Sequence, residues 1–332
     1  MPKLKERINA YVNAIASSRS QTGAPLLLLL ALLNLTVVSS AHAILAGDEN
    51  ALPADSPASR LDALGADSPF NAIGSLAISA GGFSYIGSAT AISPNWILTA
   101  GHNLDLNDVG SPTPGLSVNF NLPGFGTYAG TSFYTCPGFT GFGNPSIQND
   151  LGLIYLATPL PTSLLFPTLS GHLQIGSQVT VAGFGRSGYG NYGYTTSATL
   201  TDRRSGQNVI DALIPDAQGG GFAALFQYTF NAPNTGDSLG NNIETIIGPG
   251  DSGGPVLVTN GSGYAIAGVN TYVQGYGGQF GDTGGGIVLA PYVDWINSTM
   301  AVPEPSATAL IVLGIAIIFF LNIRRAGRIA KR

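Results

Sequence analysis

A glycine-rich hexapeptide at residues 250–255, with the sequence GDSGGP, constrains the fold of this 332-residue chain more than any other stretch. It follows a Gly-Pro turn and leads into the apolar run 256–258, which is typical of a buried strand. Glycine lets the backbone turn tightly and bring N–H groups close to another molecule. The hexapeptide therefore predicts a sharp turn that exposes the hydroxyl of Ser252. A plain glycine-rich turn is the alternative interpretation.

A serine hydroxyl is a weak nucleophile unless a base lies beside it and the base is oriented by a third group. The chain offers both partners upstream of Ser252. His102 follows the apolar run 96–100, and Asp150 opens the apolar run 151–156. The spacing is 48 residues from His102 to Asp150 and 102 from Asp150 to Ser252. The order His, Asp, Ser is that of chymotrypsin, with its spacings of about 45 and about 93 residues, and differs from the order in subtilisin and the α/β-hydrolases.

Four segments in the same order resemble the trypsin/chymotrypsin family of serine proteases. Residues 99–102 (TAGH) are similar to the family's T-A-A-H-C, Asp150 matches its D-hydrophobic-A-L segment, residues 181–185 (VAGFG) are similar to its G-W-G turn, and GDSGGP is intact. The resemblance extends from about Ile73 to Ile296. It implies an all-β, chymotrypsin-like fold of two antiparallel six-stranded β-barrels with a short C-terminal helix and a cleft between the barrels.

The resemblance also implies roles for individual residues. His102 is expected to be the general base, Asp150 to orient it, and Ser252 to form an acyl-enzyme with a peptide substrate. The N–H groups of Gly250 and Ser252 are expected to form the oxyanion hole. The family's specificity pocket maps onto five residues of this chain, none of them the acid that holds Lys or Arg in trypsins: Ile246, Thr271, Tyr272, Val273 and Gly286. An apolar, narrowed pocket predicts cleavage after small or medium apolar residues.

Short apolar runs separated by turn residues predict the strands of the two barrels. The first barrel is expected over 70–160, with strands at 73–78, 83–92, 96–99, 116–120 and 151–156. The second is expected over 161–301, with strands at 178–183, 198–202, 226–230, 255–258, 265–272 and 286–289. Residues 292–300 are predicted to form the closing helix, with Tyr292, Val293 and Ile296 on one face.

The charge of the central part excludes one class of partner. Between Ile44 and Pro303 the chain has four arginines, no lysine and sixteen acids. A basic surface for nucleic acid is therefore not expected. Cys136 is the only cysteine, so no intramolecular disulfide can form, and Asn103 follows His102 where many relatives have a cysteine. The sequence has no cluster of histidines that would indicate a metal site, and no cofactor is expected.

The first 43 residues have the features of a secretory signal peptide. A basic region is followed by an apolar stretch at 25–38 and by Ala41-His42-Ala43, which is typical of a signal peptidase site. Cleavage there would leave Ile44 at the start of a mature segment, 44–69, in which residues 53–69 are interpreted as an extra loop. By resemblance to the family, the new amino group would pair with Asp251. A retained membrane anchor is the alternative.

Residues 302–332 resemble a bacterial PEP-CTERM sorting signal. The triplet Pro303-Glu304-Pro305 precedes an apolar span at 307–323 and a tail with five basic residues. The span has about the minimum length for a transmembrane helix, and the basic tail places its end in the cytoplasm. The resemblance implies processing by an exosortase-type sorting protease, a membrane-anchored intermediate and a final place at the cell surface or outside the cell. An ordinary tail anchor is the alternative.

Two functions from different classes are compatible with these observations. The first is a secreted or cell-surface serine endopeptidase acting on proteins or peptides. The second is a catalytically silent surface or extracellular-matrix binding protein with the same fold. Covalent reaction of Ser252 distinguishes them, because only the enzyme needs an activated hydroxyl.

Overall fold

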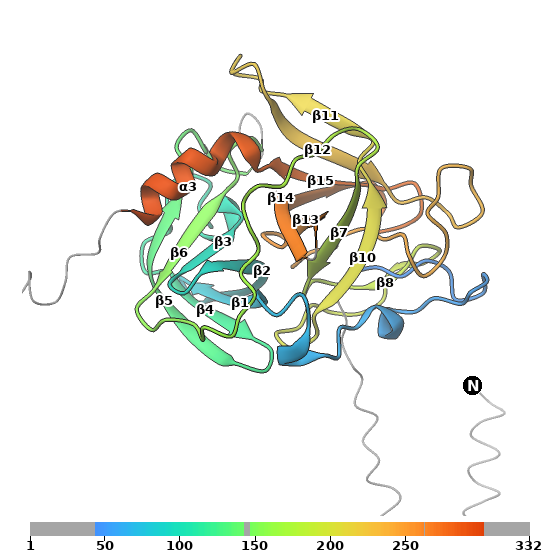
Figure 1. Ribbon diagram of the computed structural model, residues 1–332, viewed down its shortest axis with the longest axis horizontal. Coiled ribbons are helices and arrows are strands. Elements are labelled where there is room, and N and C mark those ends of the chain that lie inside the picture. The colour runs from blue at the N-terminus through green and yellow to red at the C-terminus, as the bar shows by residue number, and fades with distance from the viewer. Residues whose placement is uncertain (1–43, 143–146, 262, 302–332) are drawn as a thin grey trace, which may run out of the picture. The chain divides into compact units, whose positions relative to one another are not determined.

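The computed structural model describes residues 44–142, 147–261 and 263–301, and its first half is a closed β-barrel (Figure 1). The strands follow the order β1-β2-β3-β6-β5-β4, and every neighbouring pair is antiparallel. They are β1 (Ile73–Ala80), β2 (Phe83–Ser93), β3 (Trp96–Thr99), β4 (Ser117–Leu122), β5 (Gly126–Thr135) and β6 (Gly152–Leu156).

The barrel is filled from alternate positions of its strands, as a sheet that closes on itself requires. In β4, Val118, Phe120 and Leu122 are buried, whereas the asparagines between them are partly exposed. Phe120 lies opposite Leu76 and Val118 opposite Ile78 in the register of β1 and β4. Because this alternation is strict, a shift of one residue would expose the whole apolar set.

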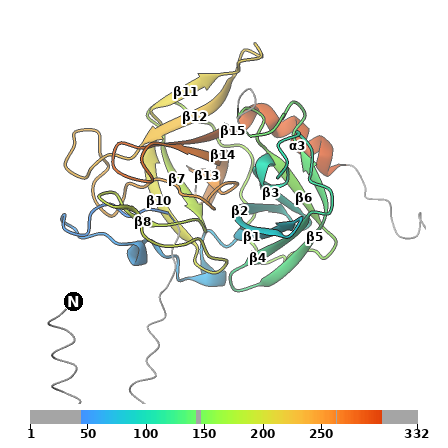
Figure 2. The same cartoon turned by 180° about the vertical axis from the view of Figure 1, so that it is seen from behind.

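The second half is a seven-stranded antiparallel sheet in the order β10-β7-β13-β14-β15-β12-β11. The expectation of a second six-stranded closed barrel is therefore wrong. Strand β11 adds a seventh, outer strand through its hairpin with β12, which projects from the body in both views (Figures 1 and 2). The strands are β7 (Gln178–Gly183), β10 (Arg204–Val209), β11 (Ala212–Pro215), β12 (Ala223–Thr229), β13 (Pro255–Asn260), β14 (Gly263–Gln274) and β15 (Thr283–Val288).

The side chain of Asn208 connects β10 to β12, two strands of the sheet that do not pair with each other. Asn208 of β10 is buried, and its amide donates to the carbonyl of Thr229 in β12 at 3.0 Å and to that of Thr245 at 2.7 Å. These bonds hold the two strands near each other without a ladder. A buried amide is stable there because its donors are satisfied.

One predicted strand, at 198–202, is absent, and strands β10 and β5 were not predicted because polar residues occupy their buried or half-buried positions. The buried positions of β10 are Arg204, Gly206 and Asn208, so apolar periodicity points to 198–202 instead, which is not a strand. Strand β5 has no fully buried position, and it was not predicted. The short hairpin of β8 (Gly188–Tyr189) and β9 (Gly193–Tyr194) was also not predicted.

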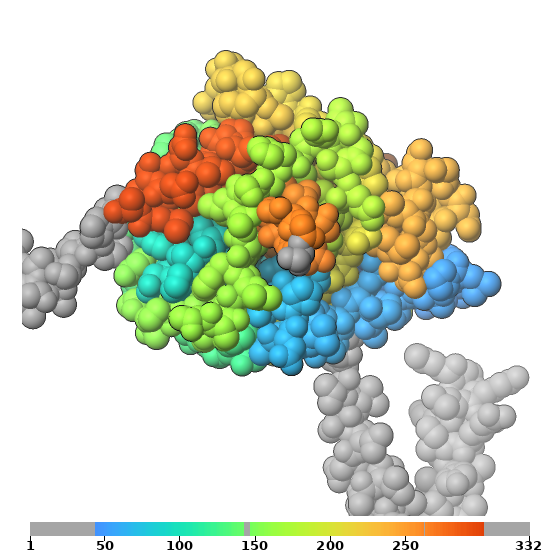
Figure 3. Space-filling view, viewed as in Figure 1, coloured from blue at the N-terminus to red at the C-terminus, as the bar shows by residue number. Residues whose placement is uncertain are grey.

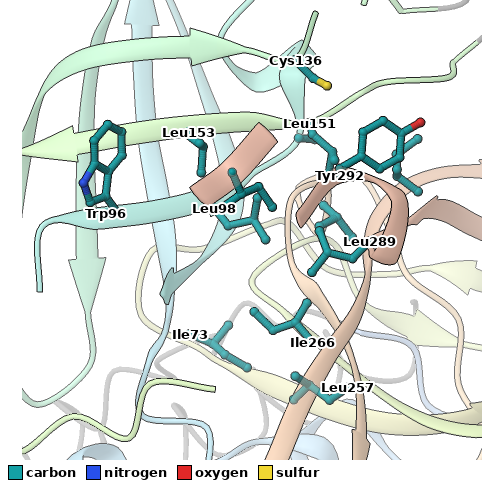
Figure 4. Close-up of a cluster of buried hydrophobic side chains, with 14 of the residues drawn as sticks. Ile73, Trp96, Leu98, Cys136, Leu151, Leu153, Leu257, Ile266, Leu289 and Tyr292 are labelled. Carbon is teal, nitrogen blue, oxygen red and sulfur yellow. The ribbon is translucent and has the colours of Figure 1, made fainter. Parts of the chain in front are cut away.

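One apolar cluster joins the barrel to the sheet (Figure 4). Trp96, Leu98 and Leu153 of the barrel belong to the same cluster as Leu257 and Ile266 of the sheet. Full burial of side chains of this size contributes about 2 kcal/mol each. The cluster therefore fixes the barrel and the sheet as one body, and residues on both can form one site.

The closing helix, α3 (Val293–Met300), follows the sheet but lies over the barrel in both views (Figures 1 and 2). It begins after a short 3-10 turn, η4 (Ala290–Tyr292). Ile296 is buried in the joining cluster, as is Tyr292, whose hydroxyl donates to the side chain of Asn149 at 3.0 Å. The predicted helix is confirmed, and it fastens the end of the sheet to the strand region around Asp150.

The segment 44–69 packs against the body (Figure 3), and buried arginines fix it there, so residues 53–69 do not form a separate extra loop. It contains η1 (Pro57–Arg60) and η2 (Gly65–Asp67). The Arg60 guanidinium pairs with Asp55 at 2.6 Å and donates to the carbonyls of residues 243 and 244. Arg203 pairs with Asp62 at 2.9 Å. Sequence reasoning treated these arginines only as charge, because their partners lie far away in the chain.

Within the part of the chain that the structure describes, no helix is long and apolar enough to cross a membrane. The expected signal peptide at 1–43 and the expected sorting segment at 302–332 lie outside the described residues.

Candidate active site

His102 and Asp150 are brought together by the pairing of two barrel strands. His102 lies in η3 (Gly101–Asn103) just after β3, and Asp150 lies just before β6, the strand that pairs with β3. Asp150 accepts hydrogen bonds from the backbone N–H of His102 and from the ring Nδ1, both at 2.7 Å. The carboxylate is fully buried, whereas the imidazole side chain is 21% exposed. The ring is therefore held from one side and open on the other.

The electrostatic environment makes His102 a stronger base than an ordinary histidine. Burial of the imidazole lowers its pKa, but the charge and hydrogen bond of Asp150 outweigh burial, and the charge of Asp108 adds to them. The pKa of His102 consequently lies above its ordinary value of 6.5. A carboxylate fixed on Nδ1 leaves Nε2 as the nitrogen that can accept a proton.

Ser252, which lies just before β13 of the sheet, faces the same cavity as His102. The cavity has a volume of about 430 Å³, and both His102 and Ser252 line it. In this structure the Ser252 hydroxyl donates a long hydrogen bond of 3.4 Å to the carbonyl of Thr271. Among the described contacts, the Ser252 hydroxyl has no hydrogen bond to His102; in enzymes, a bond of this kind often forms only when substrate binds. The three residues selected from the sequence are thus grouped at one site.

Two residues that sequence reasoning did not select hold the peptide group of Ser252. Its carbonyl accepts the N–H of Ser88 and the side-chain amide of Asn103, both at 2.9 Å. The Asn103 amide also donates to Thr99 Oγ1 at 2.9 Å. Both Ser88 and Asn103 are in the barrel region, so the barrel positions the serine of the sheet. The sequence indicated only that Asn103 stands where relatives have a cysteine.

The turn before Ser252 has the conformation that the hexapeptide predicted. Gly250 has φ of +101°, and a side chain there would place Cβ 2.8 Å from the Cα of Gly185. The Gly250 carbonyl accepts the hydroxyl of Ser88 at 2.8 Å, which fixes that peptide group. Among the described residues, no protein acceptor binds the N–H groups of Gly250 and Ser252. Both donors are therefore available to an incoming oxygen.

Asp251 is buried beside Ile44, the residue that begins the described chain. Its carboxylate accepts the N–H of Gly185 at 2.7 Å and that of Gly248 at 2.8 Å. Burial raises the pKa of Asp251 to about 7, although the N–H groups of Gly248, Gly185 and Ile44 and the charge of Arg204 favour the ionised form. Ile44 is fully buried, and its carbonyl accepts the Ser187 hydroxyl. The start of the segment 44–69 therefore reaches the turn that carries Ser252.

The cavity beside Ser252 contains part of the expected specificity pocket. Its described walls are mainly neutral or apolar, and its lining residues are His102, Phe142, Tyr194, Ile247, Gly248, Pro249, Ser252, Thr271, Tyr272, Val273, Gly275 and Gly277. Thr271, Tyr272 and Val273 line it as expected.

The other two expected pocket residues do not line that cavity. Ile246 is buried in the apolar core, and its carbonyl accepts the N–H of Leu45 at 3.1 Å, so its neighbour Ile247 faces the cavity instead. A Cβ on Gly286 would lie 1.9 Å from the Val269 carbonyl, which means that this glycine serves strand packing. Counting residues from the family's motifs does not show which side chain faces a cavity, and at Ile246 it was off by one position.

One wall of the cavity is a glycine-rich loop organised by Asp282. This carboxylate is buried and accepts the N–H groups of Tyr276 and Gly278 at 2.7 Å and that of Gln279 at 3.0 Å. Three such bonds satisfy donors that the loop would otherwise leave unpaired. Sequence reasoning missed Asp282, and its only signal is an acid at the end of a glycine-rich run.

Among the described residues outside this site, two features bear on metal binding and thiol reactivity. Within these residues no group of three His, Cys, Asp or Glu side chains is arranged to bind a metal ion. Cys136 is buried, and burial raises the pKa of its thiol to about 12, which leaves it unreactive at neutral pH.

The barrel, the sheet and the closing helix define a chymotrypsin-like all-β protein. A solved structure of neuropsin, a serine protease expressed in the limbic system of mouse brain, superposes with a TM-score of 0.51 at 16% identity, covering 72% of this chain and 98% of neuropsin. The trypsin family model matches residues 65–296. The chain therefore belongs to the trypsin family of serine proteases. No curated protein matches it by sequence.

Proposed function

We propose that this protein is a serine endopeptidase that cleaves proteins through an acyl-enzyme. One observation carries the proposal: the imidazole of His102, held at 2.7 Å by a fully buried Asp150, opens onto the same cavity as Ser252. A base oriented by a carboxylate beside a serine is the arrangement that activates a hydroxyl. Membership of the trypsin family supports protein as the substrate.

In the proposed reaction, Nε2 of His102 takes the proton of Ser252 as Oγ bonds to the substrate carbonyl carbon. The carbonyl oxygen becomes an oxyanion and accepts the N–H groups of Gly250 and Ser252. The bond to nitrogen then breaks, and His102 returns the proton to the leaving amine. After the amine has left, a water molecule gives a proton to Nε2 of His102 and bonds to the acyl carbon. The ester bond to Oγ then breaks, Oγ takes the proton back from His102, and the acid is released. Asp150 stays ionised throughout and balances the charge of the imidazolium.

The cavity walls support a preference for small or medium apolar residues before the cleaved bond. Val273 and Tyr272 narrow the cavity, and Ile247 faces it. None of the described residues lining it is an acid that would pair with Lys or Arg. A peptide library that gives preferred cleavage after Lys or Arg would contradict this part of the proposal.

Maturation at Ile44 is the second part of the proposal. A free amino group at Ile44 would lie where the backbone N–H of that residue already bonds to Asp251. It would supply a positive charge to a buried carboxylate and so stabilise the turn that carries Ser252. Removal of the signal peptide would then produce the active form without a second cleavage. N-terminal sequencing of the exported protein tests this directly.

Export and sorting form the third part. The basic and apolar features of residues 1–43 and the P-E-P triplet, apolar span and basic tail of 302–332 support it. The protein would pass through a membrane-anchored intermediate that an exosortase-type protease processes, and it would act at the cell surface or outside the cell. A full-length chain and one ending at Ala301, compared by cell fractionation, should differ in membrane association.

Labelling with a fluorophosphonate probe is the decisive experiment for the activity. The wild-type protein should react at Ser252, and Ser252→Ala should not. Asp150→Asn should react far more slowly, because a misoriented imidazole costs about 10⁴-fold in rate in such triads. A folded wild-type protein that does not react would instead favour the catalytically silent binding protein.

A further inference from the structure

Arg186 is the only exposed cation among the residues that the structure describes. Of the four arginines in that part of the chain, Arg60, Arg203 and Arg204 are buried, and there is no lysine. Arg186 is exposed in the segment between β7 and β8. This part of the chain has sixteen acids, so Arg186 is the place on its described surface where an anion can pair with a guanidinium.

The backbone and ring contacts of Arg186 fix it next to the turn that carries Ser252. Its N–H donates to the carbonyl of Pro249 at 2.8 Å, the residue before Gly250. Its guanidinium lies over the ring of Tyr194, 5.2 Å from the centroid, an arrangement that stabilises a cation while leaving its edge open. A long bond of 3.5 Å joins its Nε to the carbonyl of Thr196. The guanidinium is thus tethered rather than free to sweep the surface.

Arg186 borders a cavity of about 720 Å³, which shares Pro249 with the pocket beside Ser252. The remaining lining residues are neutral, and they are Ala77, Ile78, Ser79, Ser84, Tyr85, Ile86, Asn119, Ser197, Ala198, Leu200, Pro249 and Gly250. A guanidinium among hydroxyl and amide groups with no acid present attracts an anion.

Three cavities connect this place to the reacting groups. The first is the cavity beside Ser252 that Thr271 and Val273 also line. It shares His102 and Ser252 with a second cavity. The second shares Tyr85, Ile86 and Gly250 with the cavity of Arg186. A peptide lying in the first cavity before the cleaved bond can therefore continue past Gly250 into the third. The second cavity is also lined by Asp105 and Asp108, so an acidic group is not expected to bind there.

We propose that Arg186 forms a subsite for a carboxylate in the part of the substrate that follows the cleaved bond. This inference rests on the proposed peptidase function and names its substrate class: peptides with an apolar residue before the bond and an acidic group after it. The acidic group is either the side chain of Asp or Glu or the free C-terminus of a short product. The guanidinium binds both through the same paired N–H donors.

The test uses the purified full chain and quenched peptides that are identical up to the cleaved bond. Glu, Gln or Lys is placed in turn at each of the three following positions, and each peptide is made with a free or an amidated C-terminus. The wild-type protein should favour Glu over Gln by about three- to fivefold in kcat/KM at one position, as expected for a partly exposed ion pair. Arg186→Gln should abolish the ratio, Arg186→Lys should keep part of it, and Arg186→Glu should favour Lys.

A matched control separates local recognition from net charge. Gln174→Glu makes the chain more acidic by one unit, as Arg186→Gln does, at an exposed position that lines none of these three cavities. It should keep the Glu-to-Gln ratio. A preference for the free over the amidated C-terminus that is equal for the Glu and Gln peptides assigns the subsite to the C-terminal carboxylate, and a Glu-to-Gln ratio that survives amidation assigns it to the side chain.

Failure of the subsite and failure of the peptidase function are distinguishable. Fluorophosphonate labelling of Ser252 in the same preparation, with cleavage of all peptides at equal rates, would overturn the subsite alone. A ratio that Gln174→Glu reduces as much as Arg186→Gln does would also overturn it. No labelling and no cleavage would overturn both proposals.

Discussion

The side-chain amide of Asn103 donates a 2.9 Å hydrogen bond to the backbone carbonyl of Ser252, which connects the residue after His102 to the opposite half of the fold. Here one buried amide, bonded also to Thr99 Oγ1, ties the barrel to the serine turn. Its loss should therefore affect chemistry as well as stability.

Asn103→Ala should lower kcat about tenfold with little change in KM, because the serine turn loses one of the two donors that hold its carbonyl. It should also destabilise the fold by about 1–3 kcal/mol, the usual cost of an unpaired buried group. Asn95→Ala is a matched control, since that amide donates to the Leu156 carbonyl at 2.6 Å within the barrel. It should lose stability and keep kcat. Equal kcat in both variants would contradict the positioning role.

The pH dependence should reflect the raised pKa of His102. The base must be neutral to take the serine proton, so kcat/KM should rise with pH and reach half its maximum above pH 6.5. Asp108→Asn removes one cause of the elevation and should move this midpoint to lower pH by less than one unit. Asparagine tolerates the positive φ of 54° at this position.

The remote change Asp211→Asn removes the same charge and should leave the midpoint unchanged. The shift caused by Asp108→Asn should shrink at high salt, because screening weakens exposed charges. A midpoint that is identical in wild type and Asp108→Asn at low salt would show that Asp108 does not influence His102.

The residues proposed for chemistry were readable from the sequence because their surroundings are short contiguous motifs. His102, Asp150 and Ser252 each begin or end an apolar run, and the pairing of β3 with β6 follows from those runs. The residues that position them were not readable. Ser88 and Asn103 act on the Ser252 carbonyl across 164 and 149 positions of the chain, and no side-chain pattern marks a backbone acceptor.

The fold shows the same division between local and distant information. The barrel strand β4 alternates apolar and polar residues, and a strand was predicted there, at 116–120. Strand β10 buries Arg204 and Asn208, whose partners come from residues 57, 229 and 245. Buried polar residues whose hydrogen-bond partners lie far away in the chain give a sequence pattern typical of a loop, and this is why β10 was not predicted.

Arginines of this chain should differ sharply in their effect on stability. Arg203→Ala should cost about 3 kcal/mol or more, because it leaves Asp62 buried without its partner and the carbonyls of Ile73 and Gly65 without a donor. Arg186→Ala removes the same side chain from an exposed position, where its contact with the Tyr194 ring is worth at most about 1 kcal/mol of stability. Urea unfolding curves of the two variants check this. Similar midpoints would mean that the segment 44–69 is not fixed by Arg203.

Asp282→Ala should disturb substrate binding more than chemistry. The three N–H groups of the loop 276–279 lose their common acceptor, and the wall of the cavity beside Ser252 becomes less ordered. KM for a good peptide should rise several-fold while kcat falls less. Rates of fluorophosphonate labelling should stay near the wild-type value, because this small probe does not need the wall. A fall in kcat with unchanged KM would contradict the assignment.

The buried Asp251 gives a test of the N-terminus at Ile44. With residues still attached before Ile44, Asp251 has a pKa of about 7 in the folded state, above its ordinary value of 3.8. The folded state then binds a proton more tightly than the unfolded state does, so stability should fall as pH rises from about 4 to about 7. A chain that begins at Ile44 should, on the proposed maturation, place an ammonium beside the carboxylate, which would lower the pKa of Asp251 and remove the fall in stability.

The melting temperatures of the two forms, measured from pH 4 to pH 8, should therefore diverge as pH increases, with the form beginning at Ile44 more stable at neutral pH. Asp251→Asn, which cannot ionise, should flatten the dependence in the longer form. Acetylation of the Ile44 amine should restore the fall with pH, because it removes the charge and keeps the length. Parallel curves for the free and acetylated forms would show that the Ile44 amine does not reach Asp251.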